Sequence, residues 1–75
     1  MPRYRATIDS RHEKRVRLSV PGLLEAGATR VEIRTSKRDA DGPIELQFYL
    51  ADEINAQTVM DCSGLADLRH CVRKA

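Results

Sequence analysis

The sequence predicts a small α+β domain in which an antiparallel four-stranded sheet (β-β-β-β) carries a C-terminal helix packed on one face. Two observations lead to this prediction. Over the first fifty residues, apolar and polar residues alternate in short segments, which is the period of a half-buried strand. From Ala51 onward, apolar residues recur every three or four positions, as they do in an amphipathic helix. At 75 residues, the chain is expected to be a single domain, residues 1–75.

Four segments carry the strand pattern. We expect strands near residues 3–9, 14–20, 30–36 and 44–50. The last is the clearest, because every second residue from Ile44 to Leu50 is apolar. Pro21 and Gly22 end the second segment, and an Asp-Gly-Pro run supplies turn residues before the fourth.

The helix is expected near residues 52–74. Its apolar stripe consists of Ile54, Thr58, Cys62, Leu65, Leu68 and Val72. Gly64 is the weak point, because glycine inside a helix costs about 1 kcal/mol relative to alanine. The helix is therefore expected either to continue or to break at residues 63–64. A further alternative is a short strand at residues 58–60, followed by a helix that Ser63 caps.

The net charge of +2 is unevenly distributed along the chain. Residues 1–38 hold ten Lys and Arg against four acidic residues, a net charge of +6. Residues 39–75 hold three against seven, a net charge of −4. This separation favours charged binding surfaces over a uniformly mixed surface.

Strand alternation predicts a basic face on the sheet, opposite the helix. We expect the contact residues there to be Arg5, Arg17, Arg34 and Tyr49. Guanidinium groups pair with phosphates, and an aromatic ring can stack on an unpaired base. The alternative is that Glu32 and Glu45 pair with these arginines, which would leave a solvated face without a ligand.

The sequence therefore favours a non-catalytic small binding module that docks on a nucleic acid or a nucleoprotein complex and uses no cofactor. The main alternative is a phage or mobile-element inhibitor that blocks a host defence or nucleic-acid-processing enzyme by protein–protein contact. In that case acidic residues would mimic phosphate charge: Asp39, Asp41, Glu45, Asp52 and Glu53. Both hypotheses allow a homodimer, because a four-stranded sheet has open edges.

A small ribonuclease toxin is a further alternative. His12 and His70, with Arg15 and Tyr49, include the residue types that phosphate cleavage needs, but no pattern brings the two histidines together. We therefore expect no catalytic site. We also expect no metal site, because the spacing of the cysteines and histidines does not match that of zinc sites.

Two cysteines are too few for a disulfide-stapled secreted scaffold, and no segment reaches the roughly 20 apolar residues of a membrane span. The charged start of the sequence lacks the apolar stretch of a signal peptide. We therefore expect a cytoplasmic protein with free thiols and no membrane partner. The signatures of zinc fingers, RNA-recognition domains, phosphate-binding loops and dinucleotide-binding folds are missing.

Overall fold

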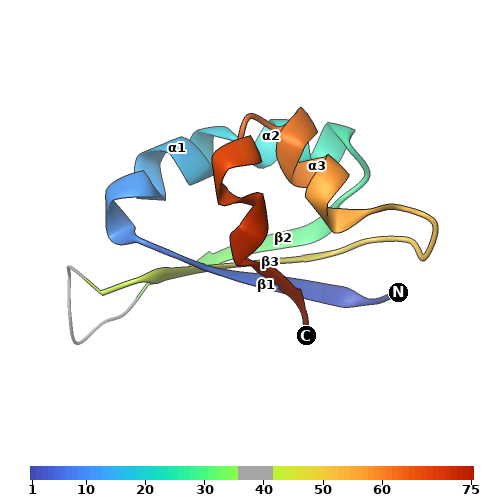
Figure 1. Cartoon of the computed structure of the whole chain (residues 1–75), viewed down its shortest axis with the longest axis horizontal. Coiled ribbons are helices and arrows are strands. Elements are labelled where there is room, and N and C mark those ends of the chain that lie inside the picture. Colours follow the sequence, from blue (N-terminus) through green and yellow to red (C-terminus); the bar gives the residue numbers. More distant parts are fainter. Residues whose placement is uncertain (36–41) are drawn as a thin grey trace.

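The computed structural model describes residues 1–35 and 42–75. It shows a four-stranded antiparallel sheet whose helices, within those residues, all lie on one side (Figure 1). In chain order the elements are β1 (Arg3–Ile8), η1 (Ser10–His12), α1 (Glu13–Leu18), α2 (Val20–Glu25), β2 (Thr29–Arg34), β3 (Ile44–Tyr49), α3 (Ala56–Cys62), η2 (Ala66–Cys71) and β4 (Val72–Lys74). The predicted fold class is confirmed.

The strands lie in the order β2-β3-β1-β4, and each neighbouring pair is antiparallel. Because β1 and β2 are not neighbours, the chain between them crosses over the sheet, and α1 and α2 form this crossover. The sequence of elements, β-α-β-β-α-β, is that of the ferredoxin-like split β-α-β motif. That motif supports many unrelated functions, so it does not by itself identify one.

The predicted strand at residues 14–20 is wrong, because this segment forms α1 and the start of α2. The apolar residues Val16 and Val20 are two strand periods apart, but they are also one helical turn apart. In the helix, Val16 is fully buried, whereas Leu18 points away from the core and is 72% exposed. The other strands agree with prediction, although β2 begins at Thr29 and ends at Arg34.

The predicted helix at residues 52–74 is interrupted near Gly64, and this interruption was one of the expected alternatives. Asn55 caps α3 by accepting a hydrogen bond from the Thr58 backbone N–H at 3.1 Å. Gly64 has φ 84°, and the Leu65 N–H donates to the Met60 carbonyl at 2.9 Å, which is the Schellman helix end. The proposed strand at residues 58–60 is wrong, since those residues lie inside α3.

After the break, the chain does not remain helical to residue 74. It makes the 3-10 turn η2 and ends in β4, which pairs with β1 through Tyr4↔Lys74, Arg5↔Arg73 and Ala6↔Val72. A strand of three residues is too short to produce a recognisable alternation. The sequence pattern therefore missed the edge strand that completes the sheet.

The core lies between the sheet and the helical layer. Residues that are at most 2% exposed come from both layers: Ala6, Ile8, Ile44, Leu46, Phe48 and Val72 from the strands, Ala28 and Leu50 next to strand ends, and Val16, Leu23, Val59, Met60 and Leu65 from the helical side. Tyr4 also faces this side and stacks on Phe48, with ring centroids 6.0 Å apart. The aromatic ring of Tyr4 is therefore not presented on the opposite face.

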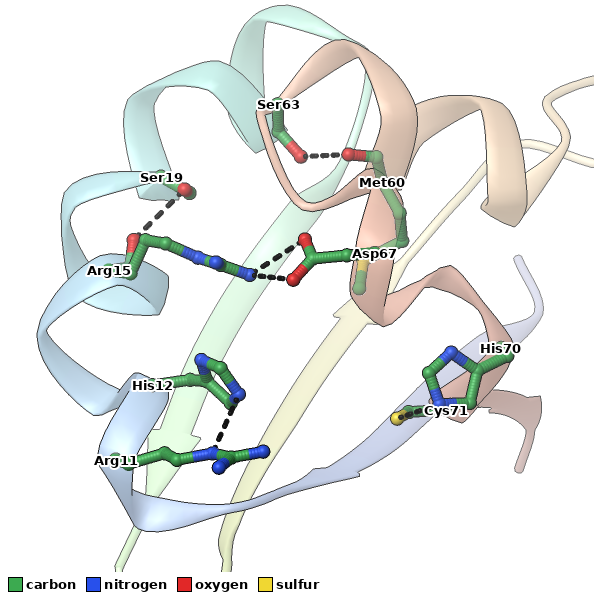
Figure 2. Close-up of polar contacts among 9 residues, drawn as sticks. All are labelled: Arg11, His12, Arg15, Ser19, Met60, Ser63, Asp67, His70 and Cys71. Carbon is green, nitrogen blue, oxygen red and sulfur yellow. Dashed lines mark hydrogen bonds and ion pairs between the residues drawn. The ribbon is translucent and has the colours of Figure 1, made fainter.

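An ion pair links η2 to α1 across the helical layer. One guanidinium nitrogen of Arg15 donates to both carboxylate oxygens of Asp67, at 2.8 and 2.9 Å (Figure 2). This hydrogen bond from Arg15 holds the pKa of Asp67 below its usual value. The pair joins two segments that are 52 residues apart in the sequence.

We expect alanine to be poorly tolerated at Gly27 and Gly64, the glycines with positive φ in the described part of the chain. Gly64→Ala should lower the free energy of unfolding by about 1–2 kcal/mol, because φ 84° is unfavourable for a residue with a Cβ while the site itself is open. Gly27→Ala should also be destabilising, because φ is 111° and the tip of the Ile54 side chain, 2.7 Å from the new Cβ, would have to move aside. Urea denaturation measures both; a Gly64→Ala chain as stable as the native one would contradict the assigned helix end.

The Arg15–Asp67 pair predicts a pH dependence of stability. Because the pKa of Asp67 is lowered by folding, its contribution is present above the unfolded value of 3.8 and is lost as pH falls through the folded value. In the Asp67→Asn variant, the free energy of unfolding should therefore decrease less as the pH falls below about 4. Arg15→Gln should reduce this decrease equally, and the double variant should add nothing further. Thermal unfolding across this pH range measures the effect, and two additive single effects would argue against the pair.

Candidate functional site

The helices leave one side of the sheet uncovered, which we call the open face (Figure 1). Strand alternation and the cross-strand register determine which side chains it carries. They are Arg3, Arg5 and Thr7 of β1, Glu32 and Arg34 of β2, Glu45, Gln47 and Tyr49 of β3, and Arg73 of β4. Neighbours across strands on this face are therefore fixed by backbone pairing.

Two arginines lie directly opposite each other on the open face. Arg5 of β1 is the register partner of Arg73 of β4, and like charges in this position repel. Arg3 is two residues before Arg5 on the same strand and face, about 7 Å away along the strand. The Arg73 guanidinium donates to the His70 carbonyl at 3.0 Å. Among the described residues, none of these three arginines has a carboxylate within ion-pair distance.

In the helical layer, three arginines form ion pairs with carboxylates. Arg15 pairs with Asp67 at 2.8 Å, Arg17 with Glu13 at 2.9 Å, and Arg69 with Asp61 at 3.1 Å. On the open face, Arg34 forms the corresponding pair with Glu32, at 3.2 Å. Within the described residues, three of the arginines without a carboxylate partner lie on β1 and β4; the other two are Arg30 of β2 and Arg11 of η1, whose guanidinium donates to the His12 ring.

The two layers also differ in net charge. The open face, with Arg30 included, carries five arginines against Glu32 and Glu45, a net charge of +3. The charged residues of the helical side are Arg11, Lys14, Arg15, Arg17, Arg69 and Lys74, the register partner of Tyr4, against Asp9, Glu13, Glu25, Asp52, Glu53, Asp61 and Asp67, a net charge of −1. The open face is therefore more basic than the helical side, although four cations of the basic first half, Arg11, Lys14, Arg15 and Arg17, lie on the helical side.

A β-bulge shapes one corner of the open face. Between Thr29 and Glu32 the register of β2 shifts, and Arg30 has φ 51°. This left-handed conformation costs a non-glycine residue about 1–2 kcal/mol. It places the Arg30 guanidinium 5.8 Å from the centre of the Tyr49 ring. A hollow of about 260 Å³ lies here, lined by Met1, Thr29, Arg30 and Tyr49.

Three of the four predicted basic-face residues lie on the open face: Arg5, Arg34 and Tyr49. Arg17 does not, because it belongs to α1 and is engaged by Glu13. Arg73 also lies on the open face but was not predicted there, since its place depends on the short strand β4.

The predicted acidic cluster is not gathered on one surface within the described residues. Glu45 lies on the open face opposite Arg34, near the start of β3. Asp52 and Glu53 lie in the turn beyond the other end of the strand, whose extended part from Glu45 to Tyr49 spans about 13 Å. Asp39 and Asp41 lie outside the described residues.

The two histidines are not brought together. His12 in η1 accepts a hydrogen bond from Arg11 at 3.3 Å, whereas the His70 ring lies 3.5 Å from the Cys71 sulfur. Figure 2 shows the rings on separate elements, neither pointing at the other. In the described part of the chain there is no group of three His, Cys, Asp or Glu side chains arranged to hold a metal ion, and Cys62 and Cys71 are free thiols.

A second hollow, of about 320 Å³, lies on the helical side. It is lined mainly by small and apolar residues of α2, α3 and the loop before α3: Gly22, Glu25, Ala26, Ile54, Thr58, Val59 and Cys62. It has neither the cationic character nor the aromatic ring of the open face.

Comparisons of the chain with protein-family models, with curated proteins and with solved structures found no match. Among the helices that the structure describes, none combines the length and the apolar character needed to cross a membrane. The candidate site is therefore defined by its own geometry: an open β face with arginines on β1 and the edge strand β4 that have no carboxylate partner among the described residues, and a tyrosine beside a hollow at one corner.

Proposed function

We propose that the chain is a non-catalytic module that binds single-stranded nucleic acid across the open face. Arg3, Arg5 and Arg73 contact phosphates, and Tyr49 stacks on an unpaired base. The observation that carries this proposal is the opposed pair Arg5 and Arg73, which lacks a carboxylate partner among the described residues. A phosphate between the two guanidinium groups would replace their repulsion by two favourable contacts.

The shape of the surface favours a single strand over a duplex. Reading the major groove of a duplex requires a helix or a narrow two-stranded ribbon that fits into it. A flat four-stranded sheet instead suits unpaired bases, which lie against the strands and stack on aromatic side chains.

The positions of Arg3, Arg5 and Tyr49 suit one bound strand. Arg3 is directly opposite Tyr49 in the register, and Arg5 is two residues further along β1. A base bound in the corner hollow would therefore lie beside an arginine. The guanidinium group of this arginine would contact the phosphate of the same nucleotide or of the next one. Arg30, held over the Tyr49 ring, offers a second planar group for the same base.

Removing single arginines should reduce the salt dependence of binding. For single strands, the slope of log K against log salt concentration changes by about 0.7 for each phosphate contact. Arg5→Ala and Arg73→Ala should each reduce the slope by about this amount, as measured by fluorescence anisotropy with labelled oligothymidylate and oligouridylate. Arg17→Ala, the same substitution on the helical layer, is the matched control and should leave the slope unchanged. No binding by the native chain at low salt would refute the proposal.

Tyr49 should contribute affinity without affecting the salt slope. Tyr49→Ala should weaken binding by about 1–3 kcal/mol, the usual contribution of stacking one base, while Tyr49→Phe should keep most of the affinity. The same titrations at several salt concentrations separate the two effects, and circular dichroism verifies that each variant is folded. Equal binding by the Ala variant and the native chain would remove Tyr49 from the site.

A further inference from the structure

β2 is an edge strand of the sheet, with β3 on its inner side. Its open-face side chains near the edge, Glu32 and Arg34, are 57% and 65% exposed. On the opposite side, Val31 and Ile33 pack against the core but remain half-buried, because no strand lies beyond them in the described chain. This edge therefore combines unpaired backbone groups with an incompletely covered apolar rim.

We propose that two copies of the chain pair antiparallel through their β2 edges, centred on Ile33, and form one eight-stranded sheet. In this register Ile33 lies opposite its counterpart, and Glu32 of each copy lies opposite Arg34 of the other. Val31 lies opposite Thr35. Residues directly opposite each other share a face, so the charged pairs extend the open face and the apolar residues extend the core.

Charge and backbone geometry select this register. A pairing centred on Glu32 would set glutamate against glutamate and Arg30 against Arg34. A pairing centred on Val31 would need Arg30 in the ladder, but its φ of 51° is not extended. A shift of one residue would place Ile33 opposite a charged side chain. Centring on Ile33 uses only residues 31–35, all of which lie after the bulged Arg30.

Charged residues on an edge strand usually prevent pairing between copies. Here the signs alternate, so the edge is complementary to itself in the antiparallel direction. The two ion pairs between Arg34 and Glu32, one within each copy, would be exchanged for two such pairs between the copies. This inference is independent of the proposed nucleic-acid binding, although the dimer would join both open faces into one surface.

Two opposite charge substitutions test the pairing. Glu32→Arg gives an edge with two arginines facing two arginines, and Arg34→Glu gives glutamates facing glutamates, so each variant alone should remain monomeric. Mixed in equal amounts they are complementary and should form a heterodimer. Sedimentation velocity in reducing, nucleic-acid-free buffer should show the native chain and the mixture rising from 8.5 kDa toward twice that mass with concentration. Glu53→Arg, the same charge change in the loop before α3, should dimerise like the native chain.

A cysteine variant tests the register separately, because Arg34→Glu also places two glutamates opposite each other within one chain, at positions 34 and 45. In a chain with Cys62→Ser and Cys71→Ser, Ile33→Cys should form a disulfide-linked dimer on mild oxidation, whereas Glu32→Cys should form much less. A native chain that stays at 8.5 kDa up to millimolar concentration would overturn the proposal. So would folded variants that do not combine, or equal cross-linking at both positions.

Discussion

The central strand pair of the sheet, β1 and β3, determines both faces of this molecule. On β3, Ile44, Leu46 and Phe48 are at most 1% exposed beneath the helices. Because a strand alternates, the same backbone necessarily directs Glu45, Gln47 and Tyr49 to the other side. A slip of one residue would exchange the two sets and bury charges in the core. The apolar contact on the inner side thus fixes which residues the open face can present.

This constraint explains why the central strands were predictable and the crossover was not. A long alternating segment such as residues 44–50 has no equally good helical arrangement. In residues 14–20 the apolar positions Val16 and Val20 satisfy both periods, and Leu23 then continues a helical stripe that a strand would not use. Only the packing of Val16 into the core, with Leu18 in solvent, distinguishes the two. Gly64, by contrast, marked the helix end correctly through its conformational freedom.

The residues of the candidate site likewise divide into those whose position could be predicted from the sequence and those whose position could not. Arg5, Arg34 and Tyr49 were correctly predicted to lie on the open face because their strands were assigned correctly. The predicted position of Arg17 on this face was wrong, because the segment that was expected to be its strand is helical. The opposition of Arg5 and Arg73 depends on pairing between the two ends of the chain, and no local pattern contains that information. The bulge at Arg30 is likewise a consequence of pairing, since nothing in the residues around it marks a left-handed conformation.

The position of β1 in the sheet has a consequence for how the chain folds. Its partners come from far along the sequence, since Arg3 pairs with Tyr49 and Arg5 with Arg73. The chain must therefore close large loops before its central strand gains a neighbour on either side, and such non-local topologies fold more slowly than helical domains of the same size. Until both neighbours have paired with it, β1 has at least one unsatisfied edge, which exposes the chain to incorrect association during this period.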